Sequence, residues 1–371
     1  MTKRNDGRTA AGQEFSGVLR NGHGPAVGYR GRTVAHEVVR RRVGLPVEER
    51  PAERHPATGV RNGESQAKLD RFRDAALAHG IPAADVERWL GLARPCLMLA
   101  SDVEGPVVGH FGKPVMLPPD VALPWLSDEQ SESSDESSDE PFGVLSDDDP
   151  SDDPLDESTD EHEHLVATLD LAALPEGATN LPLPSDGRLL LFAWPQLEAS
   201  QDTSCSSGHA VYVPAGTMVE EREAEYHYAP DHPLGDVDFD GDLRGELRVK
   251  YDVSLPNYEN FDGDPLLDEH PRASELRQVW SDVWDEDYWR KGPQLQIGGY
   301  ALDAEGWGDP VARCAHAAGD DGPRRENWSL LAQWHAGIYN LEGITMYWAI
   351  SDEDLQAHRF TPARVTMYAN P

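Results

Sequence analysis

Four aspartates with alternating spacing lie between residues 236 and 242, in the stretch DVDFDGD. The pattern D-x-D-x-D-G is typical of the start of a calcium-binding loop, because spaced carboxylates and a glycine turn can surround a hard cation with oxygen atoms. An EF-hand loop also needs an acidic residue at its twelfth position, which is Leu247 here, with Glu246 one residue early. A solvated acidic turn is the alternative to a calcium-binding module. The candidate metal ligands are Asp236, Asp238, Asp240 and Asp242.

A second set of residues with chemical potential lies late in the chain. Neighbouring carboxylates can act as general acid and base, and aromatic rings beside them suit sugar substrates. The candidates for such a hydrolase or sugar-active enzyme are Asp303, Glu305 and Asp309. The accompanying candidates for ligand binding are Trp289, Gln296, Trp307 and Trp334.

Tryptophan is concentrated in this part of the chain, with seven of its ten copies after residue 270. Trp280, Trp334 and Trp348 fall on apolar helix or strand faces, which favours positions in the core. Trp289 and Trp307 lie in polar surroundings, where a half-exposed indole often marks a contact surface.

Other catalytic and metal motifs have less support. The pair His162-x-His164 could bind zinc only with both rings on one face of a strand and a third ligand nearby, and a surface position is the alternative. Cys205 lies near His209 in sequence, but a thiol–imidazole pair forms through the fold rather than through local spacing. The sequence contains no G-x-S-x-G motif and no phosphate-binding glycine loop. No cofactor is therefore indicated.

Charge and composition exclude several classes of protein. The chain of 371 residues has a formal net charge of −35, which repels nucleic acid and anionic membrane surfaces and attracts basic proteins or divalent cations. Three widely spaced cysteines without a C-x-x-C pair fit a reducing compartment. No apolar run approaches the roughly 18 residues that span a bilayer, and the N-terminus has no secretory signal. We therefore expect a cytoplasmic protein; its oligomeric state carries no sequence signal.

Residues 127–163 form the most acidic segment, SDEQSESSDESSDEPFGVLSDDDPSDDPLDESTDEHE. It contains 17 acidic residues and no lysine or arginine, which is about half of the net charge. Such a segment buries too little apolar surface to offset the entropy of ordering it, so we expect a disordered insertion between two strands. Three interpretations are open: a solubilising insert, a docking segment for a basic partner with the PFGVL island as anchor, or a target of an acidophilic kinase.

Residues 1–64 differ from the rest of the chain, because they are rich in Arg and Gly and show no sustained periodicity. They are predicted to be a disordered basic arm or an over-extended gene start. A nucleic-acid-binding arm is disfavoured, because the segment has few clustered charges and almost no aromatic residues for stacking.

The remaining sequence predicts more strands than helices. Amphipathic spacing predicts helices within residues 66–80 and 82–94 and again within 271–284, with a short helix capped by Ser351. Short apolar runs bounded by Gly and Pro predict strands. They lie within residues 106–118, 164–171, 187–195, 212–214, 246–253, 292–303, 329–337, 344–351 and 364–370. Because no regular alternation of strands and helices occurs, we expect a single α+β domain over residues 65–371.

Several of these segments follow a characteristic order: FGKPVMLP, LPW, HLVATLDLAALP, GRLLLFAWP, QIGGY, LLAQW and ITMYWAISDEDLQAHRF. Over about residues 85–369 the order resembles the YwqG-like family of uncharacterised bacterial proteins. The resemblance implies a mostly β, α+β globular domain and brings no established activity, cofactor or catalytic residue. The chain departs from the family pattern at Gln294–Ala301, which lacks a histidine before the Gly-Gly turn, and at Tyr339–Gly343, which lacks a Gly-Asp-x-Gly turn.

These observations favour a non-catalytic interaction protein over an enzyme. The charge predicts a basic protein as partner, and a protein that neutralises a toxin in the manner of an immunity protein would be one example. The hydrolase and the calcium-binding module described above remain the alternatives.

Overall fold

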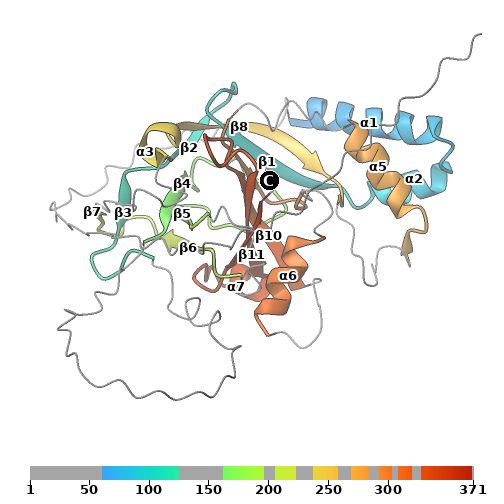
Figure 1. Cartoon of the computed structure of the whole chain (residues 1–371). Helices are drawn as coiled ribbons and strands as arrows, with labels where there is room; N and C mark the ends of the chain where they lie inside the picture. Colours follow the sequence, from blue (N-terminus) through green and yellow to red (C-terminus); the bar gives the residue numbers. More distant parts are fainter. Residues whose placement is uncertain are drawn as a thin grey trace, which may run out of the picture.

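The structure is a computed structural model, and it describes residues 61–124, 162–195, 205–222, 237–257, 269–283, 292–302, 308–319 and 327–369. The described residues form a strand-rich domain with helices at its periphery (Figure 1). Its strands are β1 (Arg94–Ala100), β2 (Val107–Phe111), β3 (Val115–Leu117), β4 (His164–Asp170), β5 (Arg188–Ala193), β6 (Gly208–Val213), β7 (Glu220–Arg222), β8 (Gly245–Ser254), β9 (Gln294–Ile297), β10 (Trp328–His335), β11 (Ile344–Ser351) and β12 (Arg364–Ala369). Its helices are α1 (Arg61–Ala78), α2 (Ala83–Leu90), α3 (Phe239–Asp242), α5 (Ala273–Val283), α6 (Pro310–Ala317) and α7 (Asp352–Gln356).

One sheet organises the domain. Ten strands pair in the order β12-β11-β10-β9-β1-β8-β2-β4-β5-β6, and all of these pairs are antiparallel. The two ends of this order meet just before β6, where the Val365 amide donates to the Cys205 carbonyl at 2.9 Å and the Ser207 amide donates to the Val365 carbonyl at 3.1 Å. The sheet is therefore nearly closed, and we call this contact the seam.

The nearly closed sheet encloses the main hydrophobic core. Side chains alternate along each strand, so that Leu189 and Leu191 of β5 face the core while Leu190 and Phe192 face outward. The outward side chains are buried as well, because helices and a small two-stranded sheet cover much of the outer surface. Burial on both faces explains why these strands read as continuous apolar runs rather than as an alternating pattern.

Three separate covers complete the packing. Helices α1, α2 and α5 lie together at one side of the sheet (Figure 1) and share a cluster that includes Phe72, Trp89 and Trp280. Helix α6 packs on β10, β11 and β12. The two-stranded sheet of β3 and β7 covers the outer face of β4, β5 and β6.

The sequence prediction missed strand β1. The sequence pattern predicts neither a helix nor a strand for the run that follows Pro95. In the structure, Arg94–Ala100 is a strand that pairs with β8 on one side and β9 on the other. The reason is that Cys96, Leu97, Met98 and Leu99 are all fully buried, so the run has no polar alternation to reveal a strand. The prediction also missed α3, α6 and β7, and it began β6 four residues late.

The other elements agree with the expectation of a strand-rich fold with N-terminal helices and a late helix. Ser351 is confirmed as the cap of α7, since its hydroxyl accepts a hydrogen bond from the Asp354 amide. Among the described residues, no helix has both the length and the apolar character needed to cross a membrane. Residues 1–60 and 125–161 lie outside the described residues, and the predictions of a basic arm and of a disordered acidic insertion stay predictions.

Candidate functional site

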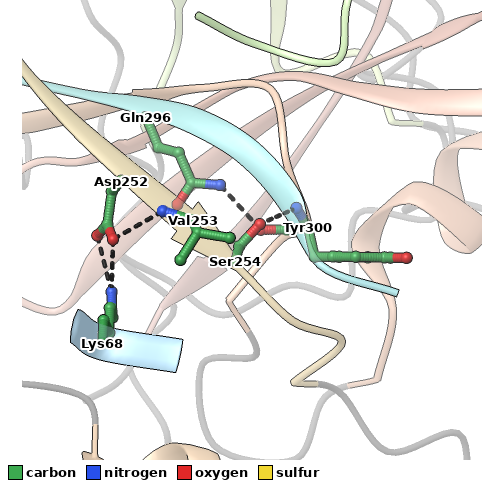
Figure 2. Close-up of polar contacts among 6 residues, drawn as sticks. All are labelled: Lys68, Asp252, Val253, Ser254, Gln296 and Tyr300. Carbon is green, nitrogen blue, oxygen red and sulfur yellow. Dashed lines mark hydrogen bonds and ion pairs between the residues drawn. The ribbon is translucent and has the colours of Figure 1, made fainter. Parts of the chain in front are cut away.

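Gln296, a predicted ligand-binding residue, is fully buried on the outer face of β9. Its Nε2 atom donates to the carbonyl of Tyr300 at 2.8 Å (Figure 2) and to the carbonyl of Gly298, also at 2.8 Å. A side chain that satisfies two carbonyls of its own turn holds that turn in place. Gln296 therefore presents no accessible surface to a ligand, which corrects the sequence prediction.

Neighbouring side chains fix the rest of the same segment, Gly298–Leu302. Ser254 accepts a hydrogen bond from the Tyr300 amide at 2.8 Å (Figure 2), and Asn180 accepts one from the Gly299 amide at 2.8 Å. Gln333 accepts one from the Leu302 amide at 2.9 Å, and the Tyr347 hydroxyl donates to the Leu302 carbonyl at 2.8 Å. The polar groups of this region are thus committed to positioning backbone.

Lys68 and Asp252 form an ion pair beside this segment. Nζ of Lys68 lies 2.8 Å from both carboxylate oxygens of Asp252, and the two side chains are only 12% and 14% exposed (Figure 2). Asp252 also accepts a hydrogen bond from the Val253 amide at 2.7 Å. The pair attaches α1 to β8. The nearby Cys96 is free and buried, and burial raises the pKa of its thiol, so it is not a reactive thiolate at neutral pH.

Of the remaining candidates for catalysis and ligand binding, the structure describes Trp334 and Asp309, and both have structural roles. Trp334 is fully buried in the main core, which is the position expected from its apolar strand. Asp309 is the N-cap of α6, and its Oδ1 atom accepts a hydrogen bond from the Val311 amide at 3.1 Å. Its buried carboxylate is thus used to cap a helix. The other candidates lie outside the described residues: Trp289, Asp303, Glu305 and Trp307.

Two aspartates of the calcium-like motif, Asp238 and Asp240, have partners within the protein. Asp238 caps the short helix α3 through a hydrogen bond from the Gly241 amide at 2.8 Å. Asp240 pairs with Lys113 at 2.8 Å on the surface. Asp236 lies outside the described residues, and Asp242 is in α3. Within the described residues, no group of three or more His, Cys, Asp or Glu side chains has the geometry to hold a metal ion.

The most distinctive pair of ionisable groups is Glu163 and His209, which sequence analysis did not identify. Nδ1 of His209 lies 2.7 Å from Oε1 of Glu163. The Glu163 side chain is fully buried, whereas that of His209 is 38% exposed. Glu163 lies immediately before β4 and His209 lies on β6, so the contact spans the intervening strand β5.

The environment shifts the pKa of both groups in the same direction. Burial raises the pKa of the Glu163 carboxyl, and the hydrogen bond from His209 only partly opposes this effect. The hydrogen bond to Glu163 raises the pKa of His209, while burial and the charge of Arg364 lower it. A carboxylate on Nδ1 fixes the tautomer of an imidazole and increases its basicity. The pair can therefore hold or exchange a proton near neutral pH.

His164, the next residue after Glu163, is buried rather than exposed. Its ring stacks on Phe239 with centroids 3.7 Å apart and on Trp194 with centroids 5.7 Å apart. Burial, with a smaller effect of Lys113, lowers the pKa of His164 to about 3, so the imidazole is neutral at physiological pH. The expectation that His164 lies on the surface is wrong, because the aromatic sandwich encloses it.

The most acidic stretch of the chain departs from and returns to this region. The Glu163 amide donates to the Pro124 carbonyl at 3.1 Å, so the described residues on either side of the 125–161 segment are hydrogen-bonded to each other. Nη2 of Arg222 donates to the carbonyls of the turn just before Pro124, at 3.2 Å for Pro118 and 2.9 Å for Pro119.

A second acidic segment, residues 223–236, begins directly after Arg222 and ends before α3. Phe239 of α3 stacks on His164, the residue after Glu163. The chain that follows the second acidic segment therefore returns close to Glu163. We call the described residues around these four chain ends the acidic base; they are Pro118–Pro124, His162–His164, Glu220–Arg222 and Val237–Asp242. The elements that carry them, β3, β7 and α3, lie at one end of the domain in Figure 1, away from α1, α2 and α5.

Little in the sequence indicates the acidic base. Glu163 is the last of 17 acidic residues in its segment and looks like the others. Only its place directly before an apolar run, HLVATL, distinguishes it, and that signal predicts a strand start rather than a buried carboxylate.

The fold and this site define a strand-rich α+β domain that brings the ends of two acidic segments together. A family model described as a domain of unknown function, DUF1963, matches residues 112–368, and the chain belongs to this family. The match begins after β1 and β2, although both strands are internal to the sheet. Among curated proteins, no match was found.

Proposed function

We propose that this chain is an interaction protein that binds a basic protein through the acidic base and the two segments that leave from it. The observation that carries the proposal is the common origin of these segments. Residues 127–163 and 223–236 together contain 21 acidic residues and no Lys or Arg. Concentrated negative charge accelerates encounter with a basic partner and favours its orientation toward this end.

Two basic side chains in and beside the acidic base, Arg222 and Lys113, support the proposal, because both are engaged within the protein. Lys113 pairs with Asp240, and Arg222 is committed to the carbonyls of the 118–121 turn. Neither is positioned to neutralise the acidic segments as a whole. A partner would supply the missing positive charge, with the apolar island Pro141–Leu145 as an additional anchor.

The proposal extends to the family branch, the source and the cellular location of the protein. We infer a YwqG-like member of the family from bacteria, acting in the cytoplasm without a cofactor, and an immunity-type role against a basic toxin is one form of such binding. The hydrolase alternative loses support from Asp309 and Gln296, whose polar atoms make structural hydrogen bonds. The calcium alternative loses support from Asp238 and Asp240, which have partners within the protein.

The test measures binding of a basic globular probe, hen lysozyme, by calorimetry over a series of salt concentrations. Two variants provide a matched comparison, because residues 223–236 and residues 258–268 each contain four acidic residues and no Lys or Arg. The first variant replaces Glu223, Glu225, Asp231 and Asp236 by their amides, and the control replaces Glu259, Asp262, Asp264 and Asp268. In the sequence, the control segment lies between β8 and α5.

We expect the 223–236 variant to bind the probe more weakly than the control variant, with a smaller dependence of affinity on salt. Replacing residues 127–161 by an uncharged Gly-Ser linker of equal length should have the largest effect. Equal affinities for the two amide variants would show that only total charge matters and would overturn the acidic base as the binding surface. Unchanged binding after the linker replacement would overturn the role of the segment.

A further inference from the structure

The Glu163–His209 pair stands where the acidic segment rejoins the sheet, and it connects that point to the seam. Through its backbone, Glu163 binds Pro124; through its side chain, it binds His209. The carbonyl of His209 in turn accepts a hydrogen bond from the indole of Trp348 at 3.1 Å. A continuous chain of contacts therefore runs from the base of the segment, across β5, to a tryptophan of the main core.

The seam lies directly beside His209. Ser207, two residues before it, contributes the 3.1 Å hydrogen bond to Val365 that closes the sheet. Cys205 contributes the other backbone hydrogen bond, from the Val365 amide to its carbonyl. His209 and the seam therefore share one short stretch of backbone, Cys205–His209.

The charged and titratable groups around the pair come from three sides. Arg364 of β12 acts on His209 from across the seam. His162 and His164 flank Glu163 on its own chain, and Lys113 acts on His164 from the segment after β2. His164 stays neutral because it is enclosed by aromatic rings. His209 therefore provides the positive charge in direct contact with the buried Glu163 carboxylate.

We infer that Glu163 and His209 form a proton-controlled latch that holds the base of the 125–161 segment against β6 and the seam. With His209 protonated and Glu163 ionised, the charged hydrogen bond compensates the buried carboxylate. When His209 loses its proton, the charge-assisted hydrogen bond to Glu163 becomes a weaker one with a neutral donor, and opening of the Glu163–Pro124 contact becomes more favourable. The idea that this latch regulates partner binding rests on the function proposed above.

The direction of the pH dependence follows from the shifts of both groups. Each has a pKa in the folded protein above its ordinary value, so the folded state binds more protons than the unfolded state. The contribution of His209 is fully present below its ordinary pKa of 6.5 and is lost as the pH rises through the higher value of the folded state. The latch therefore loosens as the pH rises above neutrality.

The experiment uses the full chain and two readouts that need no partner. The first is NMR titration of the His209 ring, and the second is hydrogen exchange of the Glu163 amide, corrected for its intrinsic rate, between about pH 5 and about pH 8. The variants are Glu163→Gln, which keeps the shape without the charge, and His209→Asn, which keeps a donor near the position of Nδ1. His79→Gln, on the exposed end of α1, is the control for removing a histidine.

In the unmodified chain we expect a raised pKa for His209, and exchange protection of Glu163 that falls as the pH rises. The fall should be about tenfold for each unit by which that pKa is raised. Glu163→Gln should return the His209 pKa toward 6.5 and make protection independent of pH. His209→Asn should reduce protection at low pH, and His79→Gln should change neither readout. An unshifted His209 titration, or protection in Glu163→Gln that still falls with pH, would overturn the latch.

The consequence for binding is measured separately with the lysozyme probe at two pH values. We expect the affinity of the unmodified chain to change more between about pH 6 and about pH 8 than that of Glu163→Gln. If both latch readouts behave as expected but affinity for the probe is absent, the latch stands and the proposed function fails. If the probe binds through the acidic base while the two readouts fail, the proposed function stands and the latch is excluded.

Discussion

At the scale of single residues, Gly299 illustrates how a turn is fixed by backbone conformation and by packing together. Its φ of +77° lies in the region that favours glycine, and a Cβ atom there would lie 2.9 Å from Cβ of Cys96 and still closer to the Ser254 hydroxyl. That hydroxyl is the acceptor for the Tyr300 amide. A side chain at position 299 would therefore disturb both the conformation and the hydrogen bond.

We predict that Gly299→Ala lowers the free energy of unfolding by about 3 kcal/mol, from left-handed strain and overpacking together. Gly177→Ala is the matched control, because Gly177 has a φ of +62° but nothing within 4 Å of a new Cβ. The control should cost about 1 kcal/mol, from strain alone. Urea unfolding of both variants measures the difference, and equal costs would contradict the packing argument.

His164 shows the opposite electrostatic behaviour from His209, only one residue away from Glu163. Its pKa of about 3 lies below the ordinary value of 6.5, so the unfolded chain binds a proton that the folded chain excludes. Its contribution to stability is present above pH 6.5 and is lost as the pH falls toward about 3.

The substitution His164→Phe should remove this acid sensitivity while keeping the stack on Phe239. Below about pH 6, the unmodified chain should lose about 1.4 kcal/mol per pH unit relative to the variant. Denaturant unfolding at a series of pH values measures the two curves. Parallel curves would show that the imidazole is not excluded from protonation.

At the scale of elements, a row of side chains runs across the outer face of the sheet. The cross-strand register aligns Lys250, Met98, Gln296, Gln333, Tyr347 and Thr366 on six successive strands. Three of them, Gln296, Gln333 and Tyr347, bind the backbone of Gly298–Leu302. Irregular backbone is thus held on a sheet by polar groups that would otherwise be unpaired when buried.

The attachment of helix α1 to β8 depends on the pair of Lys68 and Asp252. Lys68→Met keeps the aliphatic stem but leaves Asp252 with little exposure and no cation. We expect this change to lower the free energy of unfolding by about 2 kcal/mol, which is less than the cost of breaking a fully buried pair. Arg73→Met, also on α1, breaks an ion pair with Glu87 of α2 at a far more exposed site, and should change stability little. Thermal unfolding compares the two, and a similar effect of both would contradict a structural role for the Lys68 pair.

At the scale of the whole molecule, the sheet extends beyond the region that the family model matches. The match covers residues 112–368, whereas β1 pairs with both β8 and β9 and β2 pairs with both β8 and β4. Removing these strands would separate β9 from β8 and expose the main core.

We therefore predict that residues 112–371 alone do not fold, whereas residues 61–371 fold cooperatively. The shorter chain also lacks α1 and α2, so the helical cluster around Trp280 loses five of its eleven buried members. Circular dichroism and calorimetry of the two chains provide the measurement. A cooperative transition in the shorter chain would show that β1 and β2 are dispensable.

The candidate site was predictable only in part. Alternation and amphipathic spacing located most strands and helices, and charge counting identified the acidic segment, because these signals are local. The role of Glu163 had no local signal, since its burial depends on β5, β6 and the returning chain at Pro124. The burial of Gln296 also has no local signal, because the sequence shows a polar residue near a turn but not which face of the strand is covered.

The sequence by itself determined the strand-rich α+β composition, the large negative charge and the positions of most elements. Only the tertiary structure decided that β1 is central to the sheet, that the ends of two acidic segments meet, and that Glu163 is paired with His209. The physical reason is that composition and periodicity are properties of neighbouring residues, whereas strand order and burial arise from contacts between residues far apart in the chain.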